Sequence, residues 1–291
     1  MIEVSNPGKV FYPGAGVTKG DVVAYHRAVA EVLLPHLRGR PLTLRRYPDG
    51  IDGEGWFQKE ASAHFPDWLR IAEVPRRGEP GETVRHVVCD DADTLTYLAD
   101  QATIEFHVWL STADRLDCPD LLVLDLDPPE RGSGLTDLRR AARSARDLLG
   151  ELGLTPFVQT TGGRGYHVVA PLDAGTGFDG VRELARGAAD RLARSDPDRL
   201  TTAHRKDRRG DRIFLDTNRN AYGQTFVAPY SLRARPGAPV ATPVDWAELS
   251  RVEPAGFDLR KVLRRLTRKA DPWRDIHAHA ASAARALEKL G

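Results

Sequence analysis

The sequence predicts an α+β fold with mixed, largely antiparallel sheets flanked by helices. Short apolar runs follow one another in pairs joined by brief turns, which is typical of antiparallel pairing. Helical periodicity is found in separate, longer segments. The 291 residues contain no internal repeat and no linker that divides the chain convincingly, so we expect a single domain over residues 1–291.

Five segments carry apolar residues at helical spacing. The first begins near Asp21 and ends near Pro35, and both residue types are common at helix ends. The predicted helices cover residues 20–37, 136–152, 179–194, 257–269 and 274–290.

The predicted strands are rich in aliphatic, β-branched and aromatic residues and end at glycine, proline or charged turns. The run LLVLDLD, for example, is closed by Pro128 and Pro129. The charged loop AHRKDRRGDR, residues 203–212, leads into the short strand IFLD, whereas residues 41–59 are expected to be irregular. The predicted strands cover residues 84–89, 103–109, 121–127, 157–161, 165–170, 213–216 and 225–231.

The composition excludes several classes of protein. Hydrophobic residues make up 41% and charged residues 29% of the chain, which argues against a disordered or fibrous protein. No stretch approaches the ~18 consecutive apolar residues that cross a bilayer, and the start MIEVSNPGKV lacks the apolar core of an export signal. Because Cys89 and Cys118 cannot form a disulfide framework, we expect a protein of the reducing cytoplasm.

The formal net charge is +1, from 42 basic and 41 acidic residues. Taken alone, this balance argues against a strongly basic nucleic-acid binder. Only seven of the basic residues are lysines. The excess of arginine fits a genomic composition bias, and it also fits bidentate binding of phosphates, an alternative that composition leaves open.

Two carboxylates end an apolar strand. Because side chains alternate along a strand, Asp125 and Asp127 share a face and repel each other, so a divalent cation is their natural partner. Asp216 ends the strand RIFLD, and three aspartates converge if the two strands are neighbours. Such a cluster can hold two metal ions for phosphoryl or nucleotidyl transfer. The alternative is that these carboxylates only form turns or cap helices.

A glycine-rich turn joins two predicted strands in QTTGGRGYHVVAP. Its three glycines allow close approach of a ligand, and Thr161, Arg164 and His167 bring a hydroxyl, a guanidinium and an imidazole to it. A strand and not a helix follows the glycines, which excludes a dinucleotide-binding fingerprint. A tight hairpin without a ligand is the alternative interpretation.

Three motifs occur in order along the chain, namely DLDP, TxGGxGxH and FLDxxRNxxGQTxVAPYSLRARPGAPVATP. Together they resemble the polymerase domain of bacterial ligase D, a primase-polymerase of the archaeo-eukaryotic primase superfamily that acts in non-homologous end joining. The opening segment NPGKVFYPGAGVTKGDVVAYHRAVAEVLLPHLRGRP also fits, so the resemblance covers about residues 5–270. It implies the primase fold with a central catalytic cleft. It also implies a DNA-end-binding part at about 1–100, a metal and nucleotide core at about 101–245 and C-terminal helices at about 246–291.

The same resemblance implies four groups of functional residues. The catalytic, metal-binding residues are Asp125, Asp127 and Asp216. The nucleotide-binding residues are His107, Thr161, Arg164, His167, Arg233 and Arg235. The residues for a 5′-phosphate on the downstream DNA strand are Lys9 and Lys19. The template and DNA contacts are Trp56, Phe57, Lys59, Lys206 and Arg209. Thr161 stands where the family usually has serine, and Trp56 where it has phenylalanine.

The implied activity is DNA-directed nucleotidyl transfer with two Mn²⁺ or Mg²⁺ ions, filling gaps and extending broken ends with a preference for ribonucleotides. The implied partners are DNA carrying a 5′-phosphate, NTP or dNTP, the DNA-end protein Ku and a separate ligase, without a membrane. The implied location is the bacterial cytoplasm at the nucleoid. No ligase motif KxDG and no nuclease segment occurs, so we expect the polymerase alone, free-standing or excised.

Three alternatives remain at this stage. A primase that starts strands de novo has no distinguishing sequence feature. A non-catalytic module that bridges DNA ends would not need the three aspartates. A metal-dependent phosphoesterase is less favoured, because the SLRAR motif and the glycine turn indicate nucleotide binding.

Overall fold

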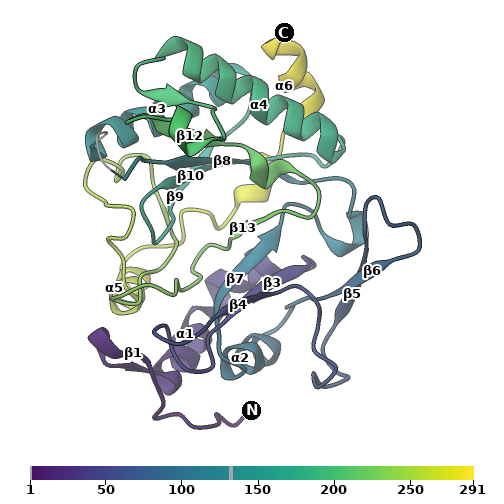
Figure 1. Cartoon of the computed structure of the whole chain (residues 1–291), viewed down its shortest axis with the longest axis vertical. Coiled ribbons are helices and arrows are strands. Elements are labelled where there is room, and N and C mark those ends of the chain that lie inside the picture. Colours follow the sequence, from purple (N-terminus) through teal and green to yellow (C-terminus); the bar gives the residue numbers. More distant parts are fainter. Residues whose placement is uncertain (1, 131–133) are drawn as a thin grey trace. The chain divides into compact units, whose positions relative to one another are not determined.

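The computed structural model describes residues 2–130 and 134–291 and confirms the α+β class with largely antiparallel sheets (Figure 1). The chain folds into two compact units, each built from segments that are distant in sequence. Unit 1 comprises Met1–Leu116, Thr225–Thr242 and Phe257–Ala270, and unit 2 comprises Asp117–Gln224, Pro243–Gly256 and Asp271–Gly291. The single domain and its three functional parts, with limits at about residues 100 and 245, stay a prediction.

Unit 1 contains a four-stranded antiparallel sheet in the order β13-β7-β3-β4 and two two-stranded ribbons, β1-β2 and β5-β6. Its strands are β1 (Val10–Tyr12), β2 (Val17–Thr18), β3 (Leu42–Arg46), β4 (Trp56–Gln58), β5 (Ile71–Pro75), β6 (Thr83–Val87), β7 (Thr103–Trp109) and β13 (Thr225–Val227). Its helices are α1 (Lys19–Leu37), α2 (Ala92–Asp100) and α5 (Leu259–Leu266). Helix α1 packs against α2, α5 and β7, so the core of this unit lies between its helices and its sheet.

A capping box fixes the start of α1. The Thr18 hydroxyl accepts a hydrogen bond from the Asp21 backbone N–H at 3.2 Å, and the Asp21 carboxylate accepts one from the Thr18 N–H at 2.8 Å. The helix therefore begins at Lys19, and this holds the lysine at a defined place in the first turn.

Unit 2 is built on a six-stranded sheet in the order β11-β12-β8-β10-β9-β14. Its strands are β8 (Leu121–Asp127), β9 (Phe157–Thr160), β10 (Tyr166–Pro171), β11 (Leu200–Thr201), β12 (Ile213–Asp216) and β14 (Thr242–Val244), the last of which begins at the end of unit 1. Its helices are α3 (Leu135–Glu151), α4 (Phe178–Ser195) and α6 (Ala283–Leu290). Helices α3 and α4 pack on β8, and Figure 1 shows them on one side of this sheet.

The prediction that residues 41–59 are irregular is wrong, because this segment contains β3 and β4. These strands pair antiparallel with Arg45 opposite Phe57, and β3 also pairs with β7. The sequence LTLRR has little strand character of its own. Pairing with a distant strand decides its conformation, and local propensity cannot show this.

The predicted helix 274–290 is interrupted. A 3₁₀ turn occupies Ile276–His279, and Ala281 then forms a parallel bridge with Leu172. Because the backbone of Ala281 bonds to the end of β10, helix α6 begins only at Ala283. None of the helices in the described part of the chain is long and apolar enough to span a membrane.

Candidate active site

The three predicted metal ligands converge in unit 2. Strand β12 pairs antiparallel with β8 so that Asp216 lies directly opposite Asp125, and Asp127 follows two residues further on the same face. One carboxylate oxygen from each of the three residues lies within 4.8 Å of the others. This arrangement of oxygen ligands fits a divalent cation such as Mg²⁺ or Mn²⁺.

The two aspartates of β8 differ in charge behaviour. Burial by itself raises the pKa of Asp125, but the attraction of His167 and Arg219 outweighs it and lowers the pKa below its usual value. Burial and repulsion from Asp125 raise the pKa of Asp127 to about 6. The cluster therefore holds more negative charge than its neighbours neutralise, which favours binding of a cation.

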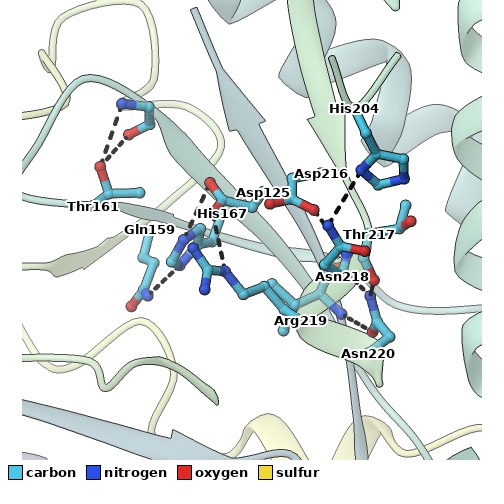
Figure 2. A network of polar contacts seen from close by, with 12 residues as sticks. Asp125, Gln159, Thr161, His167, His204, Asp216, Thr217, Asn218, Arg219 and Asn220 are labelled. Carbon is cyan, nitrogen blue, oxygen red and sulfur yellow. Dashed lines mark hydrogen bonds and ion pairs between the residues drawn. The ribbon is translucent and has the colours of Figure 1, made fainter. Parts of the chain in front are cut away.

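His167 is oriented from both sides of its ring (Figure 2). The Gln159 amide nitrogen lies 3.0 Å from Nδ1, and Nε2 lies 3.4 Å from Asp125 Oδ1. The Gln159 amide and the Asp125 carboxylate therefore hold the imidazole ring in place between them.

The glycine turn lies against the same strand. The Thr161 hydroxyl donates to the Gly165 carbonyl at 2.9 Å and accepts from the N–H groups of Gly163 and Gly165. A Cβ at Gly165 would meet the Leu126 carbonyl, so only glycine fits there. The hydroxyl predicted to bind nucleotide therefore also stabilises the turn, whereas Arg164 is exposed at the tip.

Sequence reasoning missed two residues of this site, although both are in the FLDxxRN motif. Arg219 Nε lies 3.4 Å from Asp125 Oδ2. Asn220 is fully buried and bonds both backbone groups of Val123, which ties β8 to the turn after β12. The sequence could not show this contact, because Val123 and Asn220 are distant in the chain and are brought together by the pairing of β8 and β12.

A pocket of about 440 Å³ opens beside Asp127. Arg164, Lys206 and Arg209 are among its lining residues. The Arg209 guanidinium bonds the carbonyls of Ala203 and His204 and lies 3.6 Å from the Phe214 ring, so it shapes the loop. Lys206 is exposed at the pocket wall.

In unit 1, two predicted nucleotide ligands meet a buried carboxylate. His107 Nε2 lies 2.8 Å from Glu105 Oε2, and Arg233 Nε lies 3.2 Å from the same oxygen. Arg235 is exposed two residues further on. Sequence reasoning did not assign Glu105 a role.

The predicted 5′-phosphate lysines line a pocket of about 250 Å³ in unit 1. Lys9 forms an exposed ion pair with Asp49 at 2.6 Å. Lys19 is buried and lies 2.7 Å from Asp100 Oδ1 and 2.6 Å from Ser5 Oγ. Each lysine thus has an anionic partner, but only Lys9 is open to solvent.

Two of the predicted template contacts, Trp56 and Phe57, lie on β4. Trp56 is 44% and Phe57 56% exposed, which leaves both rings available for stacking. Arg46 lies over the Trp56 ring and Arg45 over the Phe57 ring, at 5.5 and 5.0 Å from the ring centres. Lys59 follows the strand and is exposed.

Three converging carboxylates on a buried sheet, beside a glycine turn and a cationic loop, define a metal-dependent enzyme of phosphoryl or nucleotidyl transfer. A model of the LigD primase-polymerase domain family matches residues 18–273, and the chain belongs to this family. It is therefore a nucleotidyltransferase domain that acts on DNA.

Relatives in several bacteria support this membership. The chain is 36% identical to the multifunctional non-homologous end joining DNA repair protein LigD of Mycobacterium tuberculosis, over 98% of its own length and 38% of the relative. It is 35% identical to LigD of Pseudomonas aeruginosa, covering 94% of the chain and 32% of the relative. The chain thus spans less than half the length of these proteins.

A solved structure has the same fold. The polymerase domain from Mycobacterium tuberculosis ligase D, determined in complex with DNA, matches with a TM-score of 0.88 and 35% sequence identity. The match covers 96% of this chain and 99% of that domain. The fold implied by the sequence motifs is therefore confirmed.

Proposed function

We propose that this domain is a DNA-directed polymerase that fills gaps and extends broken ends during non-homologous end joining. The observation that supports this most strongly is the register of β8 and β12, which brings Asp125, Asp127 and Asp216 together in a member of the LigD family. The relatives' names refer to end joining and DNA repair.

In the proposed reaction, the primer 3′-oxygen attacks the α-phosphorus of a nucleotide, the bond to the pyrophosphate leaving group breaks, and the hydroxyl releases its proton to water. Divalent ions at the three aspartates would neutralise the triphosphate and activate the hydroxyl. Asp125 is buried and braced by His167, so it is the fixed ligand. Asp127 and Asp216 are partly exposed and face the reactants.

The proposal assigns nucleotide phosphates to cationic and hydroxyl side chains in each unit. In unit 1 these are His107, Arg233 and Arg235, and in unit 2 Thr161, Arg164 and His167. DNA contacts are assigned to Trp56, Phe57, Lys59, Lys206 and Arg209. Exposure of the β4 aromatics and of Lys206 supports these assignments.

Primer extension on a gapped duplex tests the catalytic assignment. Asp125→Asn should lower the extension rate by at least ~100-fold, because a ligand at the charge-stabilising centre is lost. The matched control is Asp147→Asn, which alters an exposed carboxylate on α3. Extension by Asp125→Asn at the wild-type rate would refute the proposal, and products on unprimed single strands would indicate a primase instead.

Family resemblance supports a preference for Mn²⁺ and for ribonucleotides. The same extension assay with each ion and each nucleotide type tests this, and faster incorporation of dNTP with Mg²⁺ would contradict it. Ku and a separate ligase are the proposed partners on the same ground. Unchanged extension when Ku is added to blunt ends would contradict a functional partnership.

Recognition of a downstream 5′-phosphate is supported by the lysine-lined pocket of unit 1. Lys9→Gln is the informative variant, because Lys9 is exposed whereas removal of Lys19 would leave buried Asp100 unpaired. The variant should show a smaller preference for the phosphorylated gap than the wild type, because one of the two lysines is lost. Retention of the wild-type preference for the phosphorylated gap would exclude this role.

A further inference from the structure

Glu105 is a carboxylate at the centre of unit 1, with no exposed surface. Four donors surround it. Oε2 accepts from His107 Nε2 at 2.8 Å and pairs with Arg233 Nε at 3.2 Å. Oε1 pairs with Arg45 at 3.2 Å and accepts from the Ala234 backbone N–H at 2.9 Å. A buried carboxylate needs such a set of partners to remain in the fold.

The charge of Glu105 determines the state of its partners. Burial by itself raises the pKa of Glu105, but the hydrogen bond from His107 and the attraction of Arg233 outweigh it and lower the pKa below its usual range. The carboxylate is therefore an anion at neutral pH and can only accept hydrogen bonds. It follows that Nε2 of His107 carries a proton and donates a hydrogen bond to Glu105.

A second set of contacts connects Glu105, through Arg45, with the exposed ring of Phe57. In the sheet of unit 1, Arg45 is paired with Glu105 on one side and with Phe57 on the other. The guanidinium contacts both, at 3.2 Å from Oε1 and 5.0 Å from the Phe57 ring centre. The Phe57 ring also meets His107 edge to face, with ring centres 5.5 Å apart. Glu105, Arg45 and Phe57 thus form one row across three strands.

We propose that Glu105 is a positioning residue that holds His107 and Arg233 for the nucleotide and, through Arg45, holds Phe57 for the DNA strand. This inference rests on the proposed function, because it takes over the roles assigned there to His107, Arg233 and Phe57. A single buried carboxylate then positions residues for nucleotide binding and for DNA binding in the same sheet.

The geometry is tested first without any substrate. Nitrogen-15 NMR of the wild-type imidazoles should show the Nε2–H form for His107, and Glu105→Gln should change that signal. An Nδ1–H form in the wild type would overturn the inference, whatever the fate of the proposed function. This measurement stays decisive even where the variant fails to fold.

The kinetic test uses Glu105→Gln, which keeps the size of the side chain and removes its charge. The nucleotide KM in primer extension should rise roughly 10- to 100-fold, the range for losing a hydrogen bond to a charged group, with a smaller change in kcat. The control is Glu73→Gln, at an exposed position on β5. His107→Ala should raise KM similarly, and the double variant should lose less than the two single effects combined, because part of the Glu105→Gln effect acts through His107 and the rest through Arg233.

The contacts of Arg45 with Glu105 and Phe57 are tested by a separate variant, Arg45→Met, which leaves Glu105, His107 and Arg233 in place. It should weaken binding of an overhang and leave the nucleotide KM unchanged, and its effect should vanish in a Phe57→Ala background. Additive effects of Arg45→Met and Phe57→Ala would overturn the inference that Arg45 positions Phe57. If His107→Ala leaves KM unchanged, the nucleotide role in the proposed function has failed, a result separate from the NMR measurement.

Discussion

At the scale of single residues, the site depends on how charges are shared between neighbours. Interactions with His167 and Arg219 lower the pKa of Asp125 against the effect of burial, whereas burial and repulsion from Asp125 raise the pKa of Asp127 to about 6. In the absence of a metal ion, ionised Asp127 therefore lowers the stability of the folded state. A bound cation would reverse this effect. This conflict between binding and stability is common where charge is collected for catalysis.

Asp127→Asn should raise the melting temperature of the metal-free protein at pH 7.5. The folded state binds the Asp127 proton more tightly than the unfolded chain, since its pKa rises from 3.8 to about 6. The stability from that proton is fully present below about pH 3.8 and is lost as pH rises through about 6. The gap between variant and wild type, measured by calorimetry in EDTA, should therefore shrink towards pH 4.

The opposite result at pH 7.5, with the wild type melting higher in EDTA, would show that repulsion in the cluster is already relieved. With Mn²⁺ the order should reverse, because the wild type gains binding energy that the variant lacks. Asp147→Asn is the control for a general charge effect, since its carboxylate is exposed.

Asp100 should prove essential for stability, unlike Asp49. Lys19 and Asp100 form a buried pair, with exposed side-chain fractions of 7% and 8%, so Asp100→Asn leaves a buried ammonium without its counter-charge. The expected loss is about 3–5 kcal/mol in the free energy of unfolding, measured by urea titration. Asp49→Asn breaks the exposed pair with Lys9 and should change the same quantity by less than about 1 kcal/mol. Equal effects of the two variants would contradict this assignment.

At the scale of elements, the pairing of β8 with β12 creates the metal cluster. The sequence allowed the prediction of β8, because its apolar run ends in DLD, and of the face that Asp125 and Asp127 share. The convergence of Asp216 was predicted only under the condition that the strands are neighbours, and the register confirms it.

Other elements could not be predicted from local patterns. Strands β3 and β4 form because β7 pairs with β3. The four donors around Glu105 come from β7, β3 and the segment after β13, so no local pattern shows them together. Long-range contacts decide both cases, and a sequence read in short windows does not contain them.

Asn220→Ala tests the tie between β8 and the turn after β12. The side chain is fully buried and satisfies the N–H and C=O of Val123, so its loss leaves two backbone groups without these partners. We expect a loss of about 2–4 kcal/mol in the free energy of unfolding, from two unsatisfied groups, with weaker Mn²⁺ binding. Gln224→Ala, at an exposed position, is the control. Unchanged Mn²⁺ affinity in a destabilised Asn220→Ala would mean that β8 does not need this tie to place its aspartates.

At the scale of the whole molecule, the near-zero net charge hides a separation of charges. Acidic groups gather at the metal cluster, and basic groups line the pockets around Lys9 and Lys206. Surface arginines such as Arg70 and Arg191 are paired with carboxylates. The total charge of +1 is therefore a poor guide to DNA affinity.

The salt dependence of DNA binding should follow individual contacts and not the net charge. For a gapped duplex with a 5′-phosphate, Lys9→Gln should reduce the slope of log affinity against log salt by about one, as expected for one lost phosphate contact. Fluorescence anisotropy over a salt series measures this slope. A variant that keeps the wild-type slope would show that Lys9 does not touch a phosphate.

The interleaved composition of the two units has a consequence for synthesis on the ribosome. The sheet of unit 1 is completed by β13, whose Thr225 pairs with Trp109 after the whole of the intervening segment has been made. Until then β7 has an open edge, which is the kind of surface that recruits foreign strands. A fragment that stops at Leu116 lacks β13 and leaves the edge of β7 unpaired, so we expect it to aggregate more readily than the complete chain.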